Sequence, residues 1–89
     1  MGFFTHNKVR NINIGSNVKF FNNSMVNAFN NCSSLNCVIN IPYGITNLSN
    51  TFRNCKSLNA PISIPNSVTN MYRTFDYCMN LNQPINIPR

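Results

Sequence analysis

The sequence has almost no acidic side chains. One Asp, no Glu and one His stand among 89 residues, beside seven Lys and Arg residues that bring the net charge to +6. Paired carboxylates for general acid–base catalysis cannot form in a chain with a single carboxylate side chain. A nucleophile with a histidine and a carboxylate would need His6 and Asp76 to meet across most of the chain. We therefore expect no enzymatic activity and no catalytic residue.

Long hydrophobic runs and nucleic-acid motifs are also missing. No apolar stretch approaches the roughly 20 residues that cross a bilayer, and the N-terminus lacks the regions of a signal peptide. The seven cationic side chains are spread along the chain without a cluster. This spread indicates a mildly cationic surface more than a nucleic-acid or anionic-lipid site. The sequence predicts neither membrane insertion nor a specific nucleic-acid partner.

The four cysteines lack the close pairs of a zinc site. Cys32, Cys55 and Cys78 are 23 residues apart, and Cys37 stands outside this series. Zinc sites use close pairs such as Cys-x-x-Cys, whereas free thiols pack as small hydrophobic groups. We expect buried structural thiols, with no metal and no other cofactor. Disulfides between neighbouring members of the series are the alternative.

What the sequence does contain is an internal repeat with a step of 23 residues. Four series run through Met25, Ile39, Ile41 and Pro42, and each continues at the same step into two later copies. Three further series form what we call the structural ladder: Phe29, Phe52 and Phe75; Cys32, Cys55 and Cys78; Leu35, Leu58 and Leu81. Seven positions in register across three copies are strong evidence for a repeat fold.

A fourth, partial copy opens the chain. Residues 12–18 match residues 39–45, but the step between these two copies is 27. Four extra residues therefore lie between Lys19 and Ser24, and we expect them to bulge out of the first full copy. Phe20 and Phe21 belong to this insertion. They either cover an end of the stack or are exposed, which makes them candidate partner contacts.

Each copy carries one strand signal and one return signal. The Ile-x-Ile motif alternates with a period of two and is closed by Pro or Gly, which is typical of a short strand followed by a turn. The apolar positions between strands advance by steps of three or four, which fits a helical turn or a compact coil with one inward face. They are, in the third copy, Val68, Met71, Phe75, Cys78 and Leu81.

These signals predict a repeat solenoid, a leucine-rich-repeat-like stack with short parallel strands and short helical or irregular returns. One domain spans residues 1–89, with a partial coil at 1–17 and full coils at about 18–42, 43–65 and 66–89. One copy buries too little apolar surface to offset the ordering of its backbone. Stacking supplies the missing stability, because each apolar position packs on its own image in the next copy.

The repeat motif resembles a known family. Ile-x-Ile-Pro-Asn-Ser-Val-Thr, followed by Phe-x-x-Cys-x-x-Leu, resembles the BspA-like leucine-rich repeat of bacterial surface proteins, some protists and phages. The same region, with Leu-Asn-Gln-Pro-Ile after it, is similar to a related surface-protein repeat first grouped from Mycoplasma. The likeness covers about residues 12–88. This chain has one residue fewer than the common BspA-like unit between Val68 and Phe75, and one more between Leu81 and Ile85.

The resemblance implies a non-catalytic protein-binding module on the surface of a bacterium or of a phage particle, acting in adhesion or in assembly. The alternative is a structural protein, a phage virion subunit whose open strand edges are closed by neighbouring chains. The expected location is the extracellular surface or the virion. The expected partner is another protein or further copies of the chain, within a larger protein or assembly.

The outward strand positions form the candidate binding face. Asn40, Ser63 and Asn86 recur there, with Ala60 and Gln83 beside them at the position of Cys37. Repeat proteins commonly bind partners on an extended face of this kind. The sequence does not indicate the chemistry of the partner.

Asparagine occurs 20 times and also recurs in register; one series is Asn36, Asn59 and Asn82, and another is Asn47 and Asn70. We interpret these amides as hydrogen-bonding along the stack and as adopting turn conformations, rather than as sugar or metal ligands. Arg53 and Asp76 occupy the same position in neighbouring copies. Their spacing predicts an ion pair between copies, worth about 0.2 to 1 kcal/mol if exposed.

Overall fold

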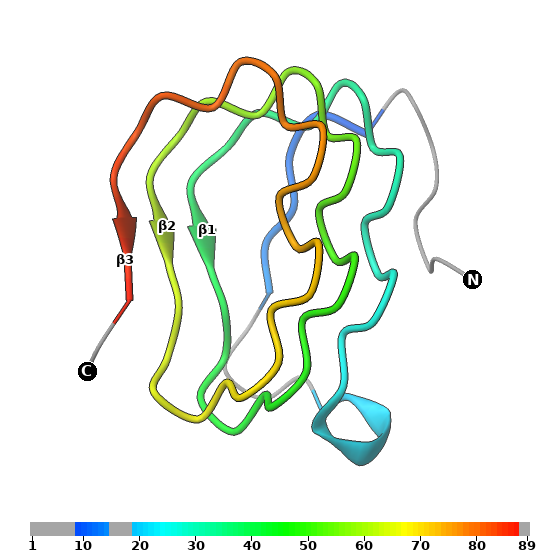
Figure 1. Cartoon of the computed structure of the whole chain (residues 1–89), viewed down its shortest axis with the longest axis vertical. Coiled ribbons are helices and arrows are strands. Elements are labelled where there is room, and N and C mark those ends of the chain that lie inside the picture. The colour runs from blue at the N-terminus through cyan, green and yellow to red at the C-terminus, as the bar shows by residue number, and fades with distance from the viewer. Residues whose placement is uncertain (1–8, 15–18, 88–89) are drawn as a thin grey trace.

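The computed structural model describes residues 9–14 and 19–87 (Figure 1). Within these ranges the elements are the short 3-10 helix η1 (Phe21–Asn23) and the strands β1 (Ile39–Asn40), β2 (Ile62–Ser63) and β3 (Ile85–Asn86). His6, Pro88 and most of the partial coil at 1–17 lie outside the described residues. No helix of the described ranges is long and apolar enough to span a membrane.

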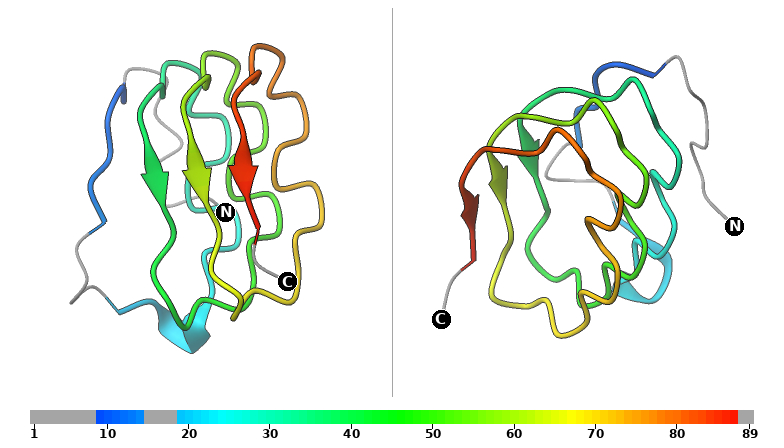
Figure 2. Two further views of the ribbon diagram at one scale, coloured as in Figure 1. Left: turned by 90° about the vertical axis from the view of Figure 1, so that its left-hand side faces the viewer. Right: turned by 45° about the horizontal axis from the view of Figure 1, so that its top comes forward.

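The three strands form one parallel sheet in the order β1-β2-β3. Ile39 pairs with Ile62, and Ile62 pairs with Ile85, so each strand is displaced from its neighbour by one 23-residue step. A second line of parallel bridges joins Ser24 to Asn47 and Asn47 to Asn70. Three successive segments of the chain therefore lie side by side in register (Figure 2).

The returns between the strands consist of turns, and the described ones contain no α-helix. Backbone N–H groups at alternate positions donate to the next segment: Met25 N to Asn47 O over 3.0 Å and Phe29 N to Thr51 O over 2.9 Å. The residues between them close turns within their own segment, as Ala28 N does to Met25 O. The compact coil, one of the two returns that the spacing allowed, is the one present.

Left-handed backbone at two positions of each return explains why no helix forms. A residue with positive φ cannot continue a right-handed helix, and only Gly and Asn adopt this region readily. The positions recur at the 23-residue step, with φ between 54° and 67°: Asn27, Asn50 and Arg73, and four residues later Asn31, Asn54 and Tyr77. Each return is therefore bent twice at fixed points.

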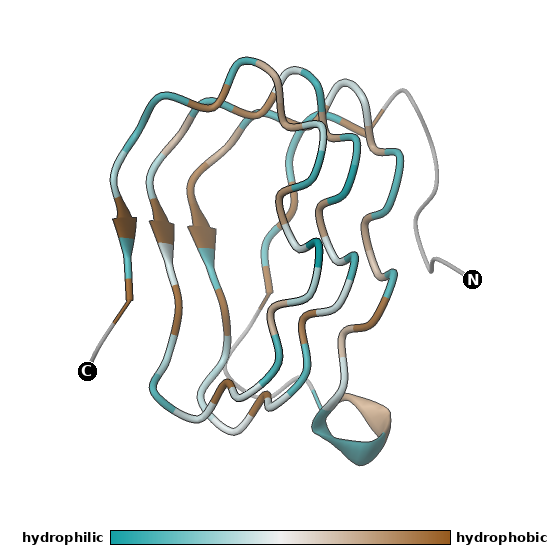
Figure 3. Ribbon diagram, in the orientation of Figure 1, coloured by the Kyte–Doolittle hydropathy of each residue, from teal (hydrophilic) through white to brown (hydrophobic). Residues whose placement is uncertain are grey.

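The hydrophobic core lies between the sheet and the returns. At its centre the rings of Phe29 and Phe52 stack with centroids 5.7 Å apart, and those of Phe52 and Phe75 with centroids 5.9 Å apart. The rings are nearly parallel, at 7° and 4°. The Cys and Leu members of the ladder are buried in the first two repeats and half-buried in the third. Figure 3 shows hydrophobic residues at matching heights in the three strands.

Candidate functional site

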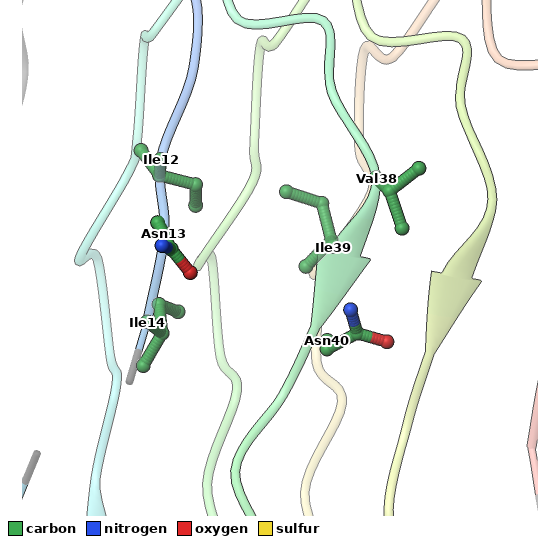
Figure 4. Close-up of a pocket in the computed structure, with 6 residues that line it drawn as sticks. All are labelled: Ile12, Asn13, Ile14, Val38, Ile39 and Asn40. Atoms are coloured by element: carbon green, nitrogen blue, oxygen red, sulfur yellow. The ribbon is translucent and has the colours of Figure 1, made fainter. Parts of the chain in front are cut away.

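The outward side of the sheet presents three polar side chains in register. Asn40, Ser63 and Asn86 are all exposed, whereas the strand residues before them are buried or half-buried. Val38 is 56% exposed and points to the same side as Asn40, away from Ile39 (Figure 4). This surface, which we call the sheet face, consists of small side chains on a backbone held by parallel pairing: Val38, Asn40, Ser63 and Asn86, with the exposed Pro61 and Pro84 at the position of Val38.

The other residues expected beside this face lie at its rim. Gln83 is exposed and Ala60 is half-buried. Cys37 is half-buried and faces the N-terminal segment, where the Ile12 N–H donates to Cys37 Sγ over 3.4 Å. The period of two places residue 38, not residue 37, on the side of Asn40. Val38, Pro61 and Pro84 were missed because the strand signal in the sequence begins only at the Ile-x-Ile motif.

The N-terminal segment 9–14 lies beside β1 at one end. Asn36 N donates to Arg10 O over 3.0 Å. Further along, a cavity of about 50 Å³ separates Ile12 to Ile14 from Val38 to Asn40 (Figure 4). A water molecule occupies about 30 Å³ of liquid, and small-molecule sites usually exceed about 300 Å³. This cavity is therefore too small for a metabolite.

A larger hollow lies beside the four-residue insertion, which forms η1. It measures about 320 Å³ and is lined by Lys19, Phe20, Asn23, Pro42, Tyr43, Gly44 and Ile45. The two phenylalanines of the insertion differ: Phe20 is half-buried and packs against the core, whereas Phe21 is 86% exposed. Of the two, Phe21 is thus the one free to meet a partner. The hollow offers one cation and two aromatic rings, with no carboxylate or thiol in its lining.

The third repeat leaves part of its apolar surface uncovered. Ile87 is 51% exposed, whereas its counterparts Ile64 and Ile41 are only 3% and 6% exposed. Phe75, Cys78 and Leu81 are half-buried, although the matching residues of the second repeat are buried. Large exposed side chains cluster in the same return: Tyr72, Tyr77 and Met79.

The predicted ion pair between neighbouring repeats is present. Arg53 Nε lies 3.7 Å from Asp76 Oδ2, and both side chains are about one-third exposed. The Arg53 guanidinium also lies 5.3 Å from the centroid of the Tyr77 ring. An exposed pair of this kind contributes less than about 1 kcal/mol, so it supports the register of the repeats more than their stability.

The amide series hydrogen-bonds differently from the expected side-chain ladder. The Oδ1 atoms of Asn36 and Asn59 accept the backbone N–H groups of Asn59 and Asn82, each over 2.9 Å. Asn47 and Asn70 instead accept N–H groups two residues ahead in their own repeat. A direct amide contact joins Asn54 Nδ2 to Asn31 Oδ1 over 2.7 Å.

All four cysteines are free thiols. Burial raises the pKa of the Cys55 thiol far above its usual range, and the neighbouring Cys78 and Cys32 raise it further. Burial also raises the pKa of Cys78. A thiol in this state is a poor nucleophile. Within the described ranges, no group of three or more His, Cys, Asp or Glu side chains could hold a metal ion.

Comparison with known proteins gives one match. A family model described as "Mycoplasma protein of unknown function, DUF285" matches residues 23–87. No curated protein and no solved structure matches the chain. The matched span contains the structural ladder and all three strands, which confirms the Mycoplasma-type part of the resemblance. The chain belongs to the DUF285 family of Mycoplasma proteins of unknown function.

Proposed function

We propose that the chain is a non-catalytic protein-interaction module, built as a BspA-like leucine-rich-repeat solenoid and carried on the surface of a bacterium or a phage particle. Three observations support the repeat architecture: the parallel strands at a 23-residue step, the stacked phenylalanines and the bridges on the return side. The module acts in attachment or assembly by binding another protein.

The sheet face carries this proposal. Its side chains are short, so a partner backbone can approach closely, and it contains no charged group whose burial would cost free energy. Asn40, Ser63 and Asn86 supply hydrogen-bonding groups in one row across the three strands, and Val38 adds apolar contact area. A face of this composition suits a protein surface, since protein interfaces combine apolar area with about one hydrogen bond per 100 to 200 Å².

A substitution at the centre of the face tests the proposal. The immobilised chain is presented to a panel of purified extracellular-matrix and cell-surface proteins, and binding is followed by interferometry. Ser63→Arg places a long charged side chain in the middle of the row and is expected to abolish the binding. Asn66→Arg, in an exposed turn away from the face, is the matched control and should bind normally. Absence of binding across the panel, or binding that Ser63→Arg leaves unchanged, would contradict the proposal.

A structural virion subunit is the second candidate function. The half-exposed ladder residues and Ile87 of the third repeat favour it, because neighbouring subunits would cover this surface. Light scattering across a dilution series of the purified chain distinguishes the two functions. A stable oligomer supports the subunit, whereas a well-folded monomer at every concentration argues against it.

A further inference from the structure

The hydrogen bonds between repeats have a direction. In the returns, alternate N–H groups of one repeat donate to carbonyl oxygens of the next. From the second repeat to the third these bonds measure 2.8, 2.9, 3.0 and 2.7 Å, and their donors are Leu48, Asn50, Phe52 and Asn54. The same four positions of the first repeat donate to the second, from Met25, Asn27, Phe29 and Asn31. Each return thus accepts from the repeat before it and donates to the repeat after it.

The third repeat repeats the donor positions without acceptors. Its equivalent N–H groups, one step of 23 residues further on, form what we call the donor row: Met71, Arg73, Phe75 and Tyr77. None of these four N–H groups has an acceptor in the part of the chain that the structure describes. A row of unpaired backbone groups at alternate residues is a template for pairing with another chain.

Side chains give the partner of such a row a recognisable chemistry. Within the chain, the later repeat donates back to the earlier one: Thr74 Oγ1 to Leu48 O over 2.8 Å, and Cys78 Sγ to Phe52 O over 3.0 Å. Thr51 and Cys55 donate in the same way to Met25 O and Phe29 O. A repeat that docks on its neighbour therefore brings a Thr hydroxyl, a Phe ring and a Cys thiol, in the order Thr-Phe-x-x-Cys.

We infer that the donor row binds a further 23-residue repeat of this same pattern, presented by another polypeptide. Its carbonyl groups accept from the donor row, its Thr and Cys donate to Met71 O and Phe75 O, and its Phe stacks on the half-buried ring of Phe75. A unit with the sequence of residues 43–65 also brings an arginine to the register position beside Asp76. The inference rests on the proposed repeat architecture and adds a second binding surface to the proposed module.

A second copy of this chain does not fit the donor row. Two third repeats facing each other would oppose N–H to N–H. The first repeat cannot serve either, because its strand side is already bonded to the N-terminal segment through Asn36 N and Arg10 O, and through Cys37 and Ile12. That segment would collide with β3 if the first repeat stacked on the third. The occupant is therefore a repeat from a different polypeptide.

A synthetic peptide of residues 43–65 tests the inference on the full 89-residue chain under reducing conditions. We expect saturable one-to-one binding by calorimetry and a rise in the midpoint of thermal unfolding with peptide concentration. Hydrogen exchange followed by NMR should show the four amides of the donor row gaining protection on binding. A peptide of the same composition in reversed order is the control for direction. A peptide with Thr51→Val and Cys55→Ala should bind at least about tenfold more weakly, because two donors are lost.

Several outcomes would overturn the inference. Equal binding of the reversed peptide, binding without protection of the donor row, or protection already present in the dilute free chain would each do so. Protection that rises with chain concentration alone would assign the surface to a second copy. The Ser63→Arg chain should bind the peptide like the unaltered chain, so failure of the sheet face and failure of the donor row are read separately.

Discussion

Asparagine at left-handed backbone positions shapes each return. Asn27 and Asn50 have positive φ at equivalent positions of the first two repeats, where most L-residues would be strained. In the third repeat Arg73 takes the same conformation, with its guanidinium 5.0 Å from the centroid of the Tyr72 ring. A cation–π contact of this kind contributes about 0.5 to 1 kcal/mol at an exposed site, which offsets part of the backbone strain.

The conformation of Asn50 can be tested with a pair of substitutions. Asn50→Ala should lower the free energy of unfolding by about 1 kcal/mol, because Ala disfavours positive φ. Asn50→Gly should change it by only a few tenths, because Gly adopts this region at no steric cost. Urea denaturation measures both. If the Ala variant were the more stable of the two, as in an ordinary helix or strand, the left-handed assignment would be wrong.

The buried thiols predict a loss of stability in alkaline solution. The pKa of Cys55 is raised by burial and that of an unfolded thiol is about 8.5. Below the unfolded value both states hold the proton and the stabilising effect is complete. Above it the unfolded chain ionises while the folded thiol does not, so the free energy of unfolding falls by up to about 1.4 kcal/mol per pH unit for each such thiol.

Thermal unfolding between pH 7 and pH 10.5 checks this dependence. Cys55→Ala should start from a lower midpoint, because a cavity forms, and its midpoint should then fall less steeply as the pH rises. Parallel curves for the two chains would show that Cys55 does not contribute to the pH dependence.

At the scale of the elements, the strands were predictable and the returns only in part. The alternation of Ile39, Asn40 and Ile41 predicts β1 directly, because side-chain direction follows from the period of two. The spacing of buried side chains in the returns fitted both a helical turn and a compact coil. It could not distinguish them, because spacing records which residues are buried and not the sign of φ at Asn27 or Asn50.

The candidate surfaces show a similar division. Asn40, Ser63 and Asn86 could be placed on one face from the sequence, but the donor row could not be foreseen. Its groups belong to the backbone, and whether they are paired depends on which segment lies beside them. Thr51 and Thr74 were also missed, although both are buried and recur at the repeat step. A threonine is usually exposed, and only its carbonyl partner in the preceding repeat explains its burial.

The stacked phenylalanines should differ in their contribution according to position. Phe52 is fully buried between two rings, whereas Phe75 is half-buried and stacks on one. Phe52→Ala is expected to cost about 3 to 5 kcal/mol, in the range of buried Phe truncations, and Phe75→Ala clearly less. Chemical denaturation of the two variants gives the comparison. Equal losses would mean that the third repeat is packed as fully as the second.

At the scale of the whole molecule, the proposed solenoid predicts that stability grows with the number of repeats. Inserting a second copy of residues 43–65 directly after Pro65 should raise the free energy of unfolding. It should also lengthen the molecule by about 4.8 Å, one strand spacing. Denaturation and small-angle X-ray scattering measure the two effects.

The matched control is an insertion of the same segment without its last three residues. It breaks the 23-residue step, so the apolar positions of the third repeat no longer meet their images, and it should destabilise the chain. If the complete insertion were no more stable than this shortened one, the molecule would not be a stack of equivalent units.

The corner at η1 separates chain length from register. Four residues have been added between Lys19 and Ser24, yet Ser24 still bridges Asn47 and the phenylalanine rings remain stacked. Sequence can therefore be gained or lost at this corner while the packing of the interior stays the same. For a lineage of repeat proteins, such a corner is where variation accumulates without a new folding problem, and for protein engineering it is the natural place to graft a foreign loop.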